Sequence, residues 1–228
     1  MEIIPGLHRI TEVRMTNVYL LLGERMTLVD TGMRGSAGRI LEAIRALDRD
    51  PAELERIIIT HPHVDHIGSL AELKRRTGAE VLAHPADIPI ITGERPEPAR
   101  PGLLLRLLAR LAPALSRFDP APVDRSLDAG ESLDLLGGAT VIHAPGHTAG
   151  SIALHFPAER LLISGDAINR LGNRLGPPPK PYTLDMGQAM RSIATLAKLD
   201  FEVLCSGHGD PIIGGAAEQV RAMLLKRT

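Results

Sequence analysis

Short apolar runs, each closed by glycine or by polar residues, recur along this chain. The runs are rich in β-branched residues and too short for buried helices, which favours β-strands. We predict strands at residues 17–23, 26–30, 56–60, 80–84, 139–144, 151–156, 160–166 and 201–207.

Longer segments between these strands carry apolar residues three or four positions apart, the spacing of one helix face. The clearest is residues 36–48, with Ile40, Leu41, Ile44 and Leu47 on that face. Further helices are predicted at residues 67–78, 184–199 and 215–227. Strands mixed with helices along one chain predict an α/β fold.

The two halves of the sequence show a weak internal similarity. Residues 20–32 and 153–166 each read as a strand, a short polar turn and a second strand that ends in aspartate. Each half then supplies a strand that ends in histidine, in "IIITHPH" and in "EVLCSGH". Because hairpins resemble one another, this similarity can arise by chance. The alternative explanation is two related halves that pack face to face.

Two segments break the pattern of strands and helices. Residues 93–122 place prolines on both sides of an apolar, arginine-bearing helix at about 102–117. This helix could belong to the core, but the prolines favour an appended element, either a lid over a site or a dimer contact. Residues 169–183 have no periodicity and are expected to form a long loop. We therefore expect one domain over residues 1–228, with a helical insertion at about 93–122.

Composition and charge exclude several classes of protein. The net charge is -1, aromatic residues make up 2% and tryptophan is absent, so a nucleic-acid partner is not expected. The single Cys205 excludes an intrachain disulfide and fits a reducing compartment. The N-terminal residues lack the features of a signal peptide, and no apolar stretch is long enough to span a membrane. We expect a soluble, cytoplasmic protein with no membrane partner.

The strongest chemical signal is "THPHVDHIGS", at the end of the strand at 56–60. His61 and His63 alternate along an extended segment, so their side chains can point the same way. Asp65 and His66 follow where the chain turns into a helix. Imidazole and carboxylate groups bind transition metals, but four ligands on both sides of one turn can hardly all reach one ion. Two adjacent metal ions are the natural solution.

More metal-capable residues follow other predicted strands, several of them beside glycines that allow close approach of the backbone. They are Asp30, His147, Asp166 and His208. Side chains at several strand ends predict a site at one edge of a layered sandwich. The other histidines, His8, His84, His143 and His155, are interpreted as structural or surface residues, and Cys205 as a buried apolar residue.

These motifs, which cover the chain from Asp30 to His208, resemble the metallo-β-lactamase superfamily. The resemblance implies a four-layer αββα sandwich with a two-metal site between its sheets. It implies that His61, His63 and His147 hold the first metal, that Asp65, His66 and His208 hold the second, and that Asp166 bridges both. Asp30 would orient a histidine ligand.

Departures from the family pattern narrow the expected activity. Position 166 is Asp where the true zinc β-lactamases carry Cys, which argues against antibiotic hydrolysis. The pattern is more similar to the glyoxalase II and acyl-homoserine lactonase branches. The chain ends 20 residues after His208, where glyoxalase II usually has a helical domain for glutathione. The resemblance is therefore strongest to the broad group of short hydrolases.

The expected activity is a binuclear zinc hydrolase, with Mn²⁺ or Fe²⁺ as alternative ions. A hydroxide between the two ions would attack a carbonyl carbon, Asp65 would carry a proton to the leaving group, and Tyr182 would donate a hydrogen bond to the substrate. A lactone or ester with an apolar acyl part is the leading substrate, and a thioester or phosphoester comes next. The main rival is a persulfide dioxygenase, which shares the fold and uses one iron. A homodimer is possible.

Overall fold

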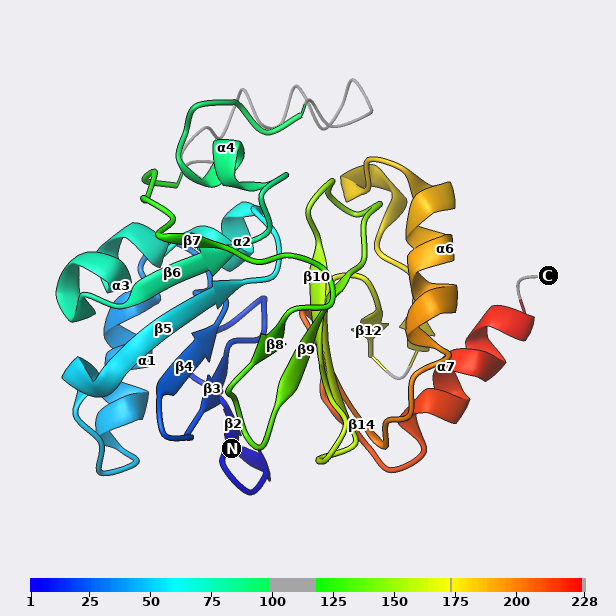
Figure 1. Ribbon diagram of the computed structural model, residues 1–228, viewed down its shortest axis with the longest axis horizontal. Helices are drawn as coiled ribbons and strands as arrows, with labels where there is room; N and C mark the ends of the chain where they lie inside the picture. Colours follow the sequence, from blue (N-terminus) through cyan, green and yellow to red (C-terminus); the bar gives the residue numbers. More distant parts are fainter. Residues whose placement is uncertain (99–117, 173, 227–228) are drawn as a thin grey trace.

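The computed structural model describes residues 1–98, 118–172 and 174–226. Two β-sheets face each other, and helices cover the outer face of each (Figure 1). The helices α1 (Ala37–Arg45) and α3 (Leu70–Thr77) flank one sheet, and α6 (Met186–Leu196) and α7 (Ala216–Leu225) flank the other. These layers confirm the predicted αββα fold.

The first sheet has seven strands in the order β1-β2-β3-β4-β5-β6-β7. Neighbours are antiparallel up to β4 and parallel from β4 to β7. Parallel neighbours end at the same edge of a sheet, which brings the residues after β4 and β5 together. The strands are β1 (Glu2–Ile4), β2 (Leu7–Arg9), β3 (Tyr19–Leu21), β4 (Met26–Val29), β5 (Leu54–Ile59), β6 (Glu80–Ala83) and β7 (Arg125–Ser126).

The second sheet has six strands in the order β15-β14-β11-β10-β9-β8. Only β11 and β14 run parallel among the described neighbours of this sheet, so the residues that follow these two strands share one edge. The strands are β8 (Ser132–Leu133), β9 (Ala139–His143), β10 (Ile152–Phe156), β11 (Leu161–Gly165), β14 (Val203–Ser206) and β15 (Ile212–Ile213).

Strand β5 explains why the run before the histidine motif is apolar on both sides. Ile57 and Ile59 pack in the cluster beneath α1 and α3, whereas Ile58 packs in the cluster between the two sheets. A strand covered on both faces needs no polar alternation, so it reads as a continuous apolar run. The inter-sheet cluster also holds Tyr19 and Phe156, one from each sheet.

Within the described residues, each predicted strand and helix has a counterpart, with two corrections. The predicted helix 67–78 is two helices, because α2 (Val64–Ile67) ends before Gly68 and α3 starts at Leu70. A Cβ at position 68 would lie 2.4 Å from the backbone nitrogen of Arg34, so only glycine fits this contact.

The second correction concerns the predicted loop at residues 169–183. It contains a hairpin of β12 (Asn169–Leu171) and β13 (Arg174–Gly176), and a 3₁₀ turn at Lys180–Tyr182. Strands of three residues are too short to show a period, which is why the pattern did not reveal them. The short helix α4 (Ile88–Ile91) was also not predicted.

The predicted lid or dimer helix at 102–117 lies outside the described residues. Within the described part of the chain, no helix is long and apolar enough to cross a membrane.

Candidate metal centre

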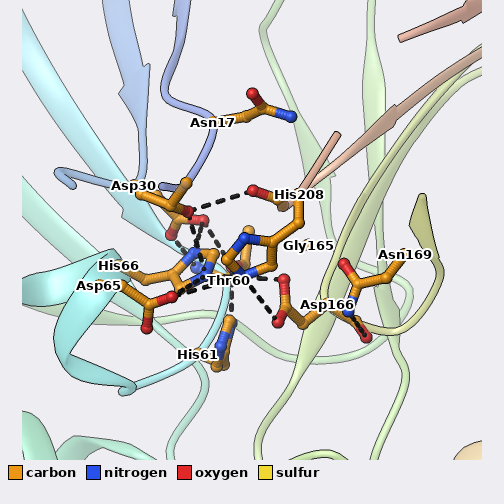
Figure 2. Close-up of polar contacts among 12 residues, drawn as sticks. Asn17, Asp30, Thr60, His61, Asp65, His66, Gly165, Asp166, Asn169 and His208 are labelled. Atoms are coloured by element: carbon orange, nitrogen blue, oxygen red, sulfur yellow. Dashed lines mark hydrogen bonds and ion pairs between the residues drawn. The ribbon is translucent and has the colours of Figure 1, made fainter. Parts of the chain in front are cut away.

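The edge shared by the two sheets gathers the metal-capable side chains that the sequence singled out. Asp30 follows β4 and His61 lies just beyond β5, while His63 directly precedes α2, which carries Asp65 and His66. From the second sheet, Asp166 follows β11 and His208 lies beyond β14, while His147 lies on the β9–β10 connection. Figure 2 shows Asp65 and His66 approaching from one side and Asp166 from the opposite side.

Three groups of these residues place one possible ligand atom of each member within 4.8 Å of the others. The groups are His61, His63 and His147; His61, His66 and Asp166; and Asp65, His66 and His208. We call the first of these the three-histidine cluster and the last the mixed cluster. Their members are those that the family resemblance assigned to the two metals.

Asp166 lies between the two clusters and contacts both. Its Oδ2 atom is 3.4 Å from Nε2 of His147 and 3.3 Å from Nε2 of His208. Its Oδ1 atom is 3.5 Å from Nε2 of His66. On the other side of the mixed cluster, Oδ2 of Asp65 is 3.3 Å from the same His208 nitrogen. One carboxylate therefore faces both clusters.

The ring nitrogens that point away from the centre have acceptors. A histidine that binds a metal with one nitrogen is oriented by what holds the other. Nδ1 is 2.8 Å from Asp30 Oδ2 in His66, 3.1 Å from Thr60 Oγ1 in His61, 3.3 Å from Thr183 Oγ1 in His147, and 2.6 Å from the Met15 carbonyl oxygen in His208. In these four rings the Nε2 atom is the one turned inward.

Several inward atoms are buried and have no hydrogen-bond partner within the described part of the chain. They are Nε2 of His61, Nε2 of His147 and Oδ1 of Asp166. A buried polar atom without a partner costs about 1–3 kcal/mol, so three in one place call for an explanation. Imidazole nitrogens and carboxylate oxygens gathered in this way are ligands that divalent cations take.

Burial keeps the three-histidine cluster neutral. It lowers the pKa of His63 to about 3 and that of His147 to about 4, and it holds the pKa of His61 well below its usual value. The positive charges of neighbouring histidines add to this effect in each case. A neutral imidazole has the free lone pair that a metal needs.

The mixed cluster behaves in the opposite way because it contains carboxylates. Burial alone would lower the pKa of His66, but Asp30, Asp65 and Asp166 outweigh it and raise this pKa to about 9. Asp166 and Asp65 likewise outweigh burial at His208 and raise its pKa to about 11. The pKa of each of these two carboxyls is lowered despite burial, because histidines surround it. The cluster thus concentrates negative charge that suits a cation.

Asp30 stands behind the site and is held tightly. Its Oδ1 accepts from the Thr60 backbone nitrogen at 2.8 Å, and its Oδ2 accepts from Thr60 Oγ1 at 2.7 Å and contacts His66. Its backbone is left-handed, with φ +63°, a conformation that costs a residue with a side chain about 1 kcal/mol or more. The surrounding contacts therefore impose this position on Asp30.

A cavity of about 470 Å³ opens from the two clusters. Its lining includes His63, Asp65, His147, Asp166 and His208, and several apolar side chains, namely Met15, Met33, Val64, Leu171 and Pro179. Tyr182 also lines it and is 39% exposed. The mouth of the site is therefore mainly apolar.

Sequence reasoning missed some residues that touch the site. Glu97 lies 3.3 Å from Nε2 of His63, and no motif around it gave a signal. Thr183 and the Met15 carbonyl group lie far along the chain from the histidines they contact. Thr60 directly precedes His61, so adjacency could have identified it.

The histidines interpreted as structural lie outside the clusters. His84 and His143 stack on each other at 4.1 Å, and Nε2 of His155 is 3.0 Å from the Asp200 carbonyl oxygen. Burial raises the pKa of Cys205, which suits an unreactive core thiol.

Comparisons with known proteins agree with this geometry. The sequence profile of the metallo-beta-lactamase superfamily matches residues 11–208. The chain is 33% identical over 231 residues to the probable metallo-hydrolase YflN of Bacillus subtilis strain 168, covering 93% of this chain and 87% of that protein. It is 30% identical over 168 residues to a hydroxyacylglutathione hydrolase of Cereibacter sphaeroides, covering 72% of this chain and 52% of the relative. The crystal structure of the metallo-beta-lactamase family protein TTHA1429 from Thermus thermophilus superposes with a TM-score of 0.76 at 25% identity, covering 99% of this chain and 80% of that one.

Proposed function

Because the chain belongs to the metallo-beta-lactamase superfamily, as its motifs predicted, we propose that it is a binuclear metal-dependent hydrolase that cleaves a carboxylic ester or lactone. The observation that carries the proposal is Asp166, whose carboxylate faces the three-histidine cluster and the mixed cluster at once. A single ion would need only one of the two clusters.

The ligand assignment follows the two clusters. His61, His63 and His147 would hold one ion, Asp65, His66 and His208 the other, and Asp166 both. Two divalent ions, for which Zn²⁺ is our choice and Mn²⁺ or Fe²⁺ the alternatives, supply Lewis acidity and lower the pKa of water to about 7. The buried atoms without partners would find in these ions the positive charge that they lack.

The remaining chemistry falls to residues that face the cavity. The Asp65 side chain is 25% exposed and lines the cavity, so it can reach a substrate and carry a proton to the leaving group. Tyr182 lines the same cavity, and we propose that its hydroxyl donates a hydrogen bond to the substrate carbonyl oxygen or to the product.

The lining of the cavity supports an apolar acyl part in the substrate. Met15, Met33 and Leu171 line the space next to the clusters, and an apolar wall favours an apolar ligand. A thioester is the second candidate, because the chain is 30% identical to a hydroxyacylglutathione hydrolase. A homodimer remains a further proposal.

The test is a hydrolysis panel followed by proton release with a pH indicator. The zinc-loaded protein is offered acyl-homoserine lactones, aryl esters, a glutathione thioester, a phosphodiester and a β-lactam. We expect turnover of lactones or esters, and loss of that turnover in Asp65→Ala.

Turnover of only the thioester would replace the bond that we propose. Failure to hydrolyse any member, together with a single iron in the native protein, would support the persulfide dioxygenase and overturn the hydrolase.

A further inference from the structure

His63 is the one histidine of the two clusters whose outer nitrogen is approached by a residue of the proline-rich segment. Glu97 Oε1 lies 3.3 Å from Nε2 of His63. We propose that Glu97 is a positioning residue for the three-histidine cluster: its carboxylate accepts the Nε2–H of His63, so that the Nδ1 lone pair faces the metal. This inference rests on the proposed function.

The proposal follows from the arrangement of the other four rings. His61, His66, His147 and His208 each have Nδ1 beside an oxygen atom, which leaves Nε2 to face the centre. In His66, Nε2 also lies 3.2 Å from Thr16 Oγ1. In His63 the oxygen is beside Nε2 instead, so Nδ1 is the nitrogen left for the centre. A neutral imidazole has one N–H and one lone pair, so whatever accepts the N–H also fixes the side from which the ring can bind a metal.

His63 lies at the point where the chain enters α2. His63 is the residue that precedes α2, with an extended backbone at φ -67° and ψ 146°. Its ring stands edge-on to His61 at 4.8 Å and to His147 at 4.4 Å. The contact with Glu97 places Nε2 of this ring against the segment that follows α4.

The surroundings of the contact favour a strong interaction. The side chains of His63 and Glu97 are 11% and 23% exposed. Pro62, Ile90 and Pro98 line the same small cavity. Poor access of water strengthens the attraction between a carboxylate and a donor compared with the same pair in solvent.

Backbone hydrogen bonds connect the segment that carries Glu97 to the body of the protein. Arg95 N donates to the Pro89 carbonyl oxygen at 2.8 Å, and Ala121 N donates to that of Ile91 at 3.2 Å. These bonds join both described ends of the predicted insertion to α4. The insertion at about 93–122 would thus contribute to metal binding through Glu97.

The experiment compares zinc binding in matched variants by competition with a chromophoric chelator. The variants are Glu97→Ala and Glu97→Gln, and the control is Glu94→Gln, an exposed carboxylate of the same segment. We expect Glu97→Ala to weaken the binding of one of the two ions by about 10–100-fold, the usual cost of removing a partner of a ligand. Glu97→Gln keeps an acceptor without the charge and should lose less, and Glu94→Gln should bind zinc like the wild type.

Cobalt substitution gives a second readout, because the visible spectrum of Co²⁺ reports ligand geometry. We expect Glu97→Ala to change the bands of one ion and to leave those of the other. If Glu97→Ala binds both zinc ions as tightly as the wild type and gives the same cobalt spectrum, the inference is wrong and the two-metal site still stands.

A wild-type protein that binds no ion would instead overturn the proposed function itself. Unfolding midpoints of the metal-free proteins in urea check the fold. If Glu97→Ala is destabilised, the nearly isosteric Glu97→Gln decides, and unchanged zinc affinity in that variant would also overturn the inference.

Discussion

The two halves of the molecule repeat one topology around the site. In the first half the hairpin β3–β4 leads through α1 to β5, which lies parallel to β4. In the second half the hairpin β10–β11 leads through α6 to β14, which lies parallel to β11. Each half places an aspartate after the second hairpin strand, Asp30 or Asp166, and a histidine after the last strand, His61 or His208.

The two aspartates nevertheless differ in what they contact. Asp30 is saturated by Thr60 and His66, whereas Asp166 points its oxygens at the inner nitrogens of three histidines. The residue before the terminal histidine explains the difference. It is Thr60 in the first half, which donates twice to Asp30, and Gly207 in the second, which has no side chain with which to bind Asp166.

Gly207 also leaves the space that Asp166 occupies. A Cβ at position 207 would lie 2.1 Å from Oδ1 of Asp166 and 2.9 Å from Cε1 of His66. Thr60 therefore keeps the Asp30 carboxylate behind the site, whereas Gly207 leaves room for the Asp166 carboxylate to enter it.

The largest expected effect comes from removing the charge that enters the site. Asp166→Asn keeps the shape of the side chain but takes a negative charge from between two proposed cations. Metal-centred charge stabilisation is worth several kcal/mol, so we expect kcat/KM to fall by about 10³-fold or more. Bound zinc, measured by elemental analysis, should fall as well. Two bound ions and wild-type activity in this variant would contradict the role of Asp166.

Replacing Gly207 by alanine should displace the Asp166 side chain. In Gly207→Ala the new Cβ cannot coexist with the present carboxylate position. A displacement of about 1 Å at a reacting centre can cost about 10²-fold in rate. We expect kcat/KM to fall by that order while the metal-free protein keeps its fold by circular dichroism.

Gly38→Ala is the matched control for this substitution, because a Cβ at that helical position meets nothing within 4 Å. Equal activity of Gly207→Ala and Gly38→Ala would show that Asp166 does not depend on the space left by Gly207.

Neutralising Asp30 should lower the affinity for zinc less than neutralising Asp166 does. Asp30→Asn tolerates the left-handed backbone and can still accept from the Thr60 nitrogen. It loses the charge beside Nδ1 of His66, and losing such a partner typically costs about 10–100-fold in metal affinity. Zinc competition measures this loss, with the exposed Asp134→Asn as control. A loss as large as that of Asp166→Asn would mean that the two aspartates are not functionally distinct.

The sequence predicted the parts of this comparison that depend on local patterns. Apolar runs revealed the strands, and the polar residues at their ends revealed seven proposed ligands and Asp30. The sequence could not reveal that Thr60 binds Asp30 and keeps its carboxylate behind the site, because that contact depends on the pairing of β4 with β5. The contact between Glu97 and His63 joins a non-periodic segment to the start of a helix, so no spacing of residues in the sequence predicts it.

A third aspartate, Asp87, connects the two halves. Its ionisation is expected to have the smallest of these effects, a change in stability with pH. Asp87 lies at the start of α4 and accepts from Thr148 Oγ1 at 2.7 Å and from the Gly150 nitrogen at 2.9 Å, on the loop that carries His147. Burial raises its pKa to about 6, although these hydrogen bonds and nearby His143 oppose the shift. The folded protein therefore holds a proton on Asp87 that the unfolded chain, with the usual value of 3.8, gives up at lower pH.

This difference in proton affinity fixes the sign of the pH effect. The stabilisation is fully present below the unfolded pKa and is lost as pH rises through about 6. Between pH 5 and pH 8 the wild type should lose about 1 kcal/mol of unfolding free energy relative to Asp87→Asn, which cannot ionise. Urea unfolding of both metal-free proteins at the two pH values measures it, since the other titrating groups are common to both. Parallel pH curves would show that Asp87 ionises in the folded protein as it does in the unfolded chain, so that the contact between the halves would carry a buried negative charge over this whole pH range.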